Sequence, residues 1–193
     1  MRLDFIALCL LCATAQTSDA AWRQALALGL DVSGSVDLQE YWLQIDGLVT
    51  ALNDHEVVSL LLSTPDAPVS IIVYEWSGPN DQVTLVPWTE VRNADDLRQV
   101  SVTLSRTERR ASTPGTALGT AMETGASLLG QKSHCWKRTL DISGDGESNL
   151  GPRPRDVKEA LSEQGITVNA LVIGADAPAS GDRRQQELSE LSS

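Results

Sequence analysis

The sequence has few positive charges. It contains 15 Lys and Arg residues against 26 Asp and Glu residues, which gives a formal net charge of -11 at pH 7. Nucleic-acid binding depends on clusters of Lys and Arg that neutralise phosphates. The densest basic group, Arg106 with Arg109 and Arg110, is short and includes Glu108, so we interpret it as a solvated loop. The composition therefore argues against a nucleic-acid partner, and an acidic surface suits a soluble protein that attracts cations.

Motifs of several enzyme classes are also missing. The sequence has no G-x-S-x-G nucleophile elbow, no G-x-x-x-x-G-K-[ST] phosphate loop and no H-E-x-x-H metal motif. Its two histidines, His55 and His134, share no ligand spacing with each other or with Cys135, which argues against a zinc site. These absences favour a protein that is not an enzyme.

Long apolar runs are scarce as well. The run at residues 5–13 is too short to cross a bilayer as a helix, which needs about 20 apolar residues. It follows Arg2 and ends in Ala13-Thr14-Ala15, a pattern typical of a cleaved export signal. We therefore expect residues 1–20 to be a signal peptide. The mature protein, residues 21–193, would then be periplasmic or secreted, without a transmembrane segment and monomeric.

Cysteines are equally few. The chain has three, and Cys9 and Cys12 would leave with the signal. Cys135 then stays alone, and we interpret it as a small buried hydrophobe. Without an internal disulfide, an exported domain of this size depends on its core or on a metal for stability.

Strand and helix patterns alternate along the rest of the chain. Apolar strand-like segments are expected at residues 26–30, 69–76, 83–86, 138–143 and 166–173. Helical spacing is expected at residues 37–52, 93–105, from 116 onward, and after Pro154. Such alternation predicts an α/β fold with a doubly wound, mainly parallel sheet. The short, turn-rich segment 77–81 predicts a hairpin, and hence one antiparallel edge strand.

Oxygen-bearing side chains follow two of these strands. Asp31 ends the first strand and is followed by Ser33 and Ser35, while Asp145 comes just after the strand at 138–143. Thr116 lies at the start of a predicted helix. Because ligands of open parallel sheets gather at the carboxyl ends of the strands, these residues can meet if the two strands are neighbours. Two carboxylates and three hydroxyls suit a hard divalent cation.

A family resemblance rests on these same residues. Asp31-Val-Ser33-Gly-Ser35 resembles the D-x-S-x-S motif of von Willebrand factor type A domains, and Gly115-Thr116 and Ile142-Ser-Gly-Asp145-Gly146 resemble their threonine and aspartate loops. The segments Tyr74-Glu-Trp-Ser-Gly78 and Gly165-Ile-Thr-Val-Asn169 are similar to a branch of exported bacterial proteins of unassigned function. The resemblance covers about residues 22–175 and implies a three-layer, Rossmann-type architecture.

The resemblance also implies a metal-ion-dependent adhesion site. In it Asp31, Ser33, Ser35, Thr116 and Asp145 would hold a divalent cation, usually Mg²⁺, with Mn²⁺ or Ca²⁺ as alternatives. The implied function is to present that cation to a carboxylate of a protein partner. Such domains normally add a final strand and helix after the strand at 166–173, whereas this chain has a polar tail from about residue 176, so the last two elements could be lacking.

Two other functions stay open. The pattern of strand, Asp31 and a later Gly-Asp-Gly also resembles the haloacid-dehalogenase phosphatases, but these need a second acid where this chain has Ser33. A metal that only staples the loops together is the other alternative. Asp31 could also simply end a strand.

Several further residues have open roles. Glu75 and Asp141 lie inside apolar strands, where a charge is costly unless it is paired. Each could either support the metal ligands from behind or be a hydrogen-bonded structural acid, and both roles stay open. Glu147 and Asn149 are candidates for the rim of the site. The tryptophans are expected mainly in the core, with Trp88 the best candidate for an exposed contact.

Overall fold

A computed structural model describes residues 22–145 and 147–173 of the chain. Its strands are β1 (Gln24–Asp31), β2 (Val69–Trp76), β3 (Gln82–Val91), β4 (Lys137–Gly144) and β5 (Ile166–Val172). Its helices are α1 (Leu38–Asn53), α2 (His55–Leu61), α3 (Ala94–Ser105), α4 (Leu118–Gly130) and α5 (Pro154–Glu163). The expected export signal, the tail from about residue 176 and Gly146 lie outside the described residues.

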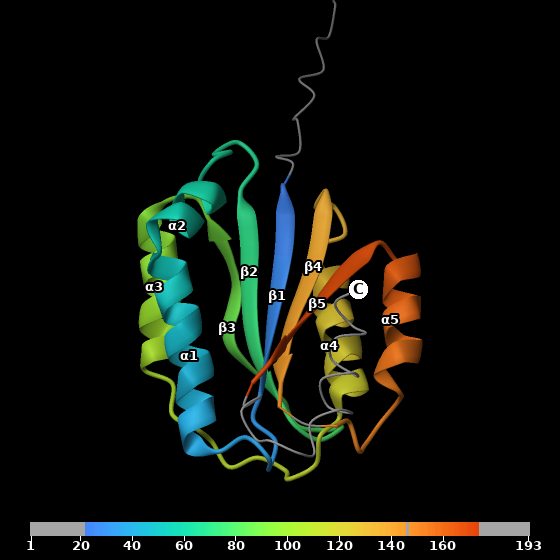
Figure 1. Cartoon of the computed structure of the whole chain (residues 1–193). Coiled ribbons are helices and arrows are strands. Elements are labelled where there is room, and N and C mark those ends of the chain that lie inside the picture. The colour runs from blue at the N-terminus through green and yellow to red at the C-terminus, as the bar shows by residue number, and fades with distance from the viewer. Residues whose placement is uncertain (1–21, 146, 174–193) are drawn as a thin grey trace, which may run out of the picture.

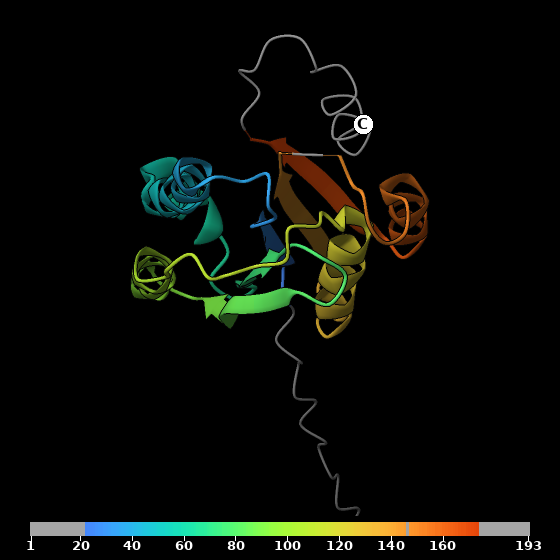
Figure 2. The same cartoon turned by 90° about the horizontal axis from the view of Figure 1, so that it is seen from below.

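The strands form one sheet with the order β3-β2-β1-β4-β5. β2 and β3 pair antiparallel as a hairpin, and the other neighbours pair parallel. Helices α1, α2 and α3 cover one face, and α4 and α5 cover the other (Figures 1 and 2). The predicted α/β fold class, with a mainly parallel sheet and one antiparallel edge strand, is confirmed.

The central strand β1 is apolar from Ala25 to Leu30 because both of its faces are covered. Ala25 and Ala27 belong to the core cluster under α4 and α5, whereas Leu28 and Leu30 belong to the cluster under α1 and α3. Successive side chains of a strand point to opposite faces, so a continuous apolar run is what a strand between two helical layers requires. The same rule applies to β2, in which every residue is buried.

Local sequence signals set where several elements begin and end. Asp37 and Glu40 form a reciprocal capping box at the start of α1, and Asn93 and Asp96 form another at α3. Gly165 has a φ of 71° between α5 and β5, in the region that glycine adopts without steric cost. These signals agree with the predicted order of elements.

The structure corrects three details of the sequence interpretation. α2 was not predicted, because its seven residues follow α1 directly and only the new cap Asp54 separates the two helices. Trp88 is partly buried against the core, whereas Trp136, just before β4, is 67% exposed. Cys135 is buried, as predicted.

Among the described residues, none of the helices has both the length and the apolar character needed to cross a membrane.

Candidate metal centre

The site lies at the carboxyl ends of the neighbouring strands β1 and β4. Asp31 is the last residue of β1, and Asp145 directly follows β4. The two strands pair in parallel, so both acids reach the same edge of the sheet. From β1 the chain crosses to β2 on one side, while β4 lies on the other side, which makes this edge the point where strand order reverses.

Four of the five predicted site residues are joined by hydrogen bonds. The backbone amide of Ser33 donates to Asp31 Oδ1 over 2.8 Å, and the hydroxyls of Ser33 and Ser35 lie 3.1 Å apart. Ser35 Oγ donates to Asp145 Oδ1 over 2.7 Å. Asp31 and Ser33 are fully buried and Asp145 is nearly so, whereas Ser35 is exposed. The result is a chain of oxygen atoms that runs from the buried end of β1 to the surface.

The second carboxylate oxygen of Asp31 has no partner. Oδ2 is buried, and no atom of residues 22–145 or 147–173 donates a hydrogen bond to it. Burial raises the pKa of Asp31 to about 6, and the nearby charge of Asp145 adds to this, although hydrogen bonds from Ser33 and from the backbone of Asp145 lower it. A buried carboxylate is costly unless it is paired or binds a metal. The orphaned oxygen therefore fits a cation site.

Gly144 leaves room beside this oxygen. A Cβ atom at residue 144 would lie 3.4 Å from Asp31 Oδ2 and 3.5 Å from the ring of Trp76. A side chain there would fill the space next to the unpaired oxygen. The glycine of the Ser-Gly-Asp segment thus keeps the approach to Asp31 open.

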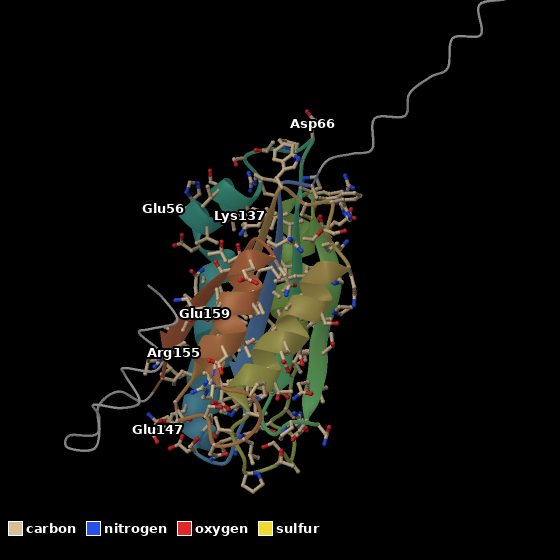
Figure 3. The ribbon with its side chains drawn as sticks, turned by 90° about the vertical axis from the view of Figure 1, so that its right-hand side faces the viewer. Glu56, Asp66, Lys137, Glu147, Arg155 and Glu159 are labelled. Atoms are coloured by element: carbon tan, nitrogen blue, oxygen red, sulfur yellow. The ribbon has the colours of Figure 1, made fainter. Side chains whose placement is uncertain are left out.

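The fifth residue, Thr116, is held by the loop that follows β4. Its backbone amide donates to Asn149 Oδ1 over 3.0 Å, and the backbone amide of Asn149 donates to the Thr116 carbonyl over 2.9 Å. Thr116 is 4% exposed. Gly34 N donates to Pro114 O over 3.2 Å, which brings the Thr116 segment against the loop of Ser33 and Ser35. Asn149, a candidate for the rim, therefore positions Thr116, and Glu147 is exposed at the same end of the molecule (Figure 3).

The donor set consists of two carboxylates and three hydroxyls. Such all-oxygen sets suit Mg²⁺, Mn²⁺ or Ca²⁺, whereas zinc in proteins is bound mainly by sulfur and nitrogen. Within residues 22–145 and 147–173, no group of three or more His, Cys, Asp or Glu side chains could hold a metal ion.

The two acids inside strands have partners away from the site. Glu75 is fully buried, accepts a 2.9 Å hydrogen bond from the Tyr41 hydroxyl and pairs with Arg110 over 3.0 Å. Burial and the charge of Glu75 raise the pKa of Tyr41. Asp141 accepts a hydrogen bond from the side chain of Asn169, and burial raises its pKa. Both are hydrogen-bonded acids in these positions, and neither contacts the site through these bonds.

The arginine pair was misinterpreted from sequence. Arg109 Nη2 donates to the carbonyl oxygens of Ser33, over 3.4 Å, and Val36, over 2.5 Å. Arg110 binds the buried Glu75. The segment is therefore not simply a solvated loop. The sequence signal that could have found it is Glu75, because an acid in an apolar strand requires a cationic partner.

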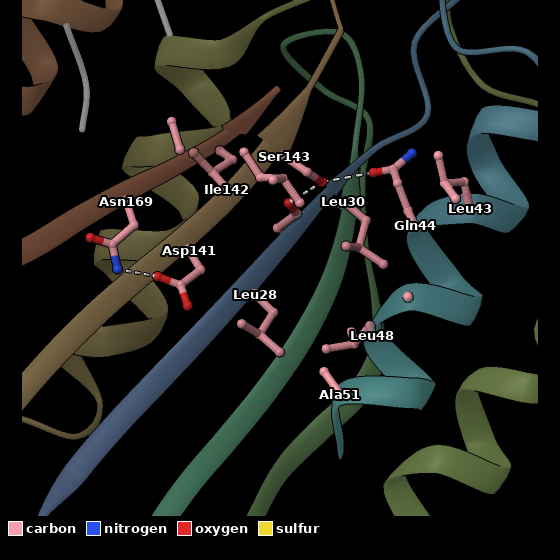
Figure 4. Close-up of a pocket in the computed structure, with 14 residues that line it drawn as sticks. Leu28, Leu30, Leu43, Gln44, Leu48, Ala51, Asp141, Ile142, Ser143 and Asn169 are labelled. Carbon is pink, nitrogen blue, oxygen red and sulfur yellow. Dashed lines mark hydrogen bonds between the residues drawn. The ribbon is translucent and has the colours of Figure 1, made fainter. Parts of the chain in front are cut away.

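An apolar groove lies beside the site, between α1 and strands β1, β4 and β5 (Figure 4). Its volume is about 390 Å³. Gln44 lies in its wall, where its Nε2 donates to the Asp31 carbonyl over 2.9 Å and its Oε1 accepts from Ser143 Oγ over 2.7 Å. Through Gln44, the wall of the groove is hydrogen-bonded to the backbone of Asp31 and to Ser143 on the strand that leads to Asp145.

Solved structures share this fold. Proximal thread matrix protein 1 from the mussel byssus, solved with a zinc-occupied MIDAS motif, is 18% identical with a TM-score of 0.65, over 90% of this chain and 42% of that protein. A von Willebrand factor type A protein from Catenulispora acidiphila is 15% identical with a TM-score of 0.59, over 89% and 37%. An aerotolerance-related membrane protein from Bacteroides fragilis is 20% identical with a TM-score of 0.58, over 82% and 73%.

These likenesses establish a von Willebrand factor A-like fold. The chain spans less than half the length of the mussel and Catenulispora proteins. No curated protein matches the sequence. A family model described as "Protein of unknown function (DUF1194)" matches residues 21–191. The chain therefore belongs to this family, and its fold is that of a von Willebrand factor A-like domain.

Proposed function

We propose that this protein is a metal-dependent binding module that presents a divalent cation to an acidic group of a protein partner. The ligands in this proposal are Asp31, Ser33, Ser35, Thr116 and Asp145. The observation that carries it is the buried Oδ2 of Asp31, which has no hydrogen-bond partner in the described part of the chain and belongs to a cluster of oxygen atoms.

The charge of the ligand set supports presentation of the ion to a partner. Two carboxylates balance the two charges of the ion, and hydroxyls are weak donors. When bound, a cation held in this way would supply an electrophilic position that a carboxylate from another molecule can occupy. Ser35 is exposed, so the outer end of the cluster faces the solvent from which a partner would come.

The preferred ion in this proposal is Mg²⁺, with Mn²⁺ and Ca²⁺ as alternatives. Mg²⁺ favours a few carboxylates and retained waters, whereas Ca²⁺ takes six to eight oxygen ligands. The zinc ion was found in the mussel protein, and its presence there does not rank the ions for this chain. Titration of the purified protein with each ion in a calorimeter would rank them.

The proposed setting is outside the cytoplasm, in the periplasm or the medium, as a monomer. Support comes from the apolar run at residues 5–13 and the Ala13-Thr14-Ala15 segment. Amino-terminal sequencing of the protein from its own cells would show whether residues 1–20 are removed.

A direct experiment compares Asp31→Ala with wild type. We expect wild type to bind Mg²⁺ and to capture a protein from the envelope or the medium only without chelator. Asp31→Ala should lose both properties. Asp46→Ala is the matched control, because Asp46 is an exposed acid on α1. Capture by wild type that persists in excess chelator would contradict the proposal.

Three further assays distinguish the alternatives: aryl phosphate hydrolysis, thermal unfolding and water-proton relaxation. A magnesium-dependent phosphatase would hydrolyse an aryl phosphate, but the position two residues after Asp31 holds Ser33 rather than the second acid that such enzymes use. A purely structural metal would raise the melting temperature without an exchangeable water position. Water-proton relaxation with Mn²⁺ in the site distinguishes that case, since the proposed module should keep exchangeable water.

A further inference from the structure

The segment 106–116 connects the loops around the candidate metal centre, and we call it the strap. On one side it contacts the β1–α1 loop. Arg109 Nη2 donates to the carbonyls of Ser33 and Val36, and Gly34 N donates to Pro114 O over 3.2 Å. Ser112 Oγ donates to the carbonyl of Val32. The strap thus makes hydrogen bonds to the three consecutive residues from Val32 to Gly34 and to Val36.

On its other side the strap is anchored to β2 and the β2–β3 turn. Arg110 pairs with the buried Glu75 and with Asp81. Thr113 accepts from Gly78 N over 3.0 Å, and its own amide donates to Asp81 Oδ2 over 2.8 Å. Adjacent arginines therefore hold opposite sides: Arg110 fixes the strap to the sheet, and Arg109 reaches from it to the loop of Ser33.

The contacts of Arg109 bear directly on a proposed ligand. Its guanidinium holds the carbonyl of Ser33, while the amide of the same residue is bound to Asp31 Oδ1. Two ends of one residue are thereby fixed, which limits where the Ser33 hydroxyl can lie. Both bonds leave one nitrogen, Nη2, which donates to Val36 over 2.5 Å and to Ser33 over the longer 3.4 Å. The bond to Val36 is therefore the stronger of the two.

We infer that Arg109 is a positioning residue of the metal centre, an inference that rests on the proposed function. It holds the β1–α1 loop in the geometry that a cation requires before the cation arrives. Geometry and charge act here in opposite directions. A positive charge near the site repels a cation, so removing it would strengthen binding if charge dominated, whereas loss of positioning would weaken binding.

The test measures Mg²⁺ affinity by calorimetry for Arg109→Ala, Arg109→Lys and Arg106→Ala. We expect Arg109→Ala to weaken binding about 10- to 100-fold, the usual effect of losing a residue that orients a metal ligand. Arg109→Lys keeps the charge, but its nitrogen lies one bond closer to the backbone than Nη2 does, so it should recover only part of the affinity. Arg106→Ala is the charge control, since Arg106 is exposed on the same strap. It should bind about as wild type does.

A second measurement does not depend on the metal. Hydrogen exchange of the chelator-treated protein should be faster at the Gly34 and Val36 amides in Arg109→Ala and unchanged in Arg106→Ala. Denaturant unfolding shows whether each variant is folded, and Ser112→Ala offers a milder loosening of the same loop if Arg109→Ala is not. Equal or tighter binding with unchanged exchange would overturn the inference. If wild type binds no cation, the proposed function fails, while the exchange data still report on the loop.

Discussion

Ser35 Oγ donates a 2.7 Å hydrogen bond to Asp145 Oδ1, although the two residues are 110 positions apart in the sequence. The bond joins the loop after β1 to the loop after β4. Because β1 and β4 are paired neighbours, their two loops leave the sheet at the same edge. The candidate metal centre therefore forms only because β1 and β4 are neighbours in the sheet.

Replacing Asp31 by Asn should stabilise the protein in chelator and abolish its stabilisation by Mg²⁺. Burial raises the pKa of Asp31 from 3.8 to about 6, and about two pKa units correspond to about 3 kcal/mol of opposition to folding at neutral pH. The Asn side chain removes the buried charge and keeps an oxygen for the Ser33 amide. Urea unfolding with and without excess Mg²⁺ measures both effects. A less stable Asp31→Asn protein in chelator would contradict this expectation, and Asp46→Asn is the control.

Replacing Asp81 by Asn should cost stability in a pH-dependent way. Burial raises the pKa of Asp81, but hydrogen bonds from Ser77, Thr113 and Arg110 outweigh burial and hold the pKa at about 2. A carboxyl with a lowered pKa stabilises the fold above its unfolded pKa of 3.8, and this contribution disappears as the pH falls toward about 2.

The difference in unfolding free energy between wild type and Asp81→Asn should therefore be about 2 kcal/mol at pH 7. It should shrink between about pH 4 and pH 2. Urea titrations at a series of pH values provide the measurement. A difference that stays constant across this range would show that the charge of Asp81 is not responsible.

The Glu75–Arg110 pair should show strong energetic coupling. The Glu75 side chain is 1% exposed and that of Arg110 is 24% exposed, so removing one partner leaves a poorly solvated charge. Loss of one partner of a buried pair costs about 3–5 kcal/mol, and residues in contact deviate from additivity. A double-mutant cycle with Ala should give a coupling energy above about 1 kcal/mol.

A matched cycle on the exposed pair Glu90 and Arg92 provides the comparison. Their side chains are 32% and 53% exposed, and such surface pairs contribute little. We expect a coupling energy below about 0.5 kcal/mol there. Similar values for the two cycles would argue that the Glu75 pair is not an anchor of the strap.

Two glycines on helices should respond oppositely to alanine. A Cβ at Gly119 would lie 2.1 Å from the carbonyl oxygen of Pro152, so α4 or the loop after β4 must shift. We expect Gly119→Ala to cost about 3 kcal/mol. Gly47 in α1 has nothing within 4 Å of the equivalent position, and Gly47→Ala should stabilise by about 0.5–1 kcal/mol. Thermal unfolding of both variants checks the contrast, and a stable Gly119→Ala protein would argue against this packing.

Much of the fold could be predicted because its signals are local. The apolar run that ends at Asp31 and the caps at Asp37 and Asn93 lie within a few residues of the elements that they define. The hairpin of β2 and β3 followed from the short turn between them. α2 was missed because a cap directly after a helix, here Asp54, looks the same in sequence as the end of that helix.

The exposure of the tryptophans could not be predicted in the same way. Trp88 lies in β3 and packs partly against the core, while Trp136 precedes a strand whose start lies at the surface. Trp88 ends the apolar run Leu85-Val86-Pro87, whereas Trp136 stands between Cys135 and Lys137. Which one is covered depends on whether another element lies over it, and that is a property of the assembled layers.

By itself, the sequence determined the order of strands and helices apart from α2, the acid at the end of β1 and the D-x-S-x-S spacing, because these depend on neighbouring residues. Only the tertiary structure decided that Ser35 meets Asp145, that Asp31 Oδ2 has no partner among the described residues and that Arg109 contacts the Ser33 carbonyl. Each of these features depends on which strands are neighbours and on how the strap crosses between their loops. Residues far apart in the chain meet only once the sheet has formed, so their contacts cannot be deduced from local patterns.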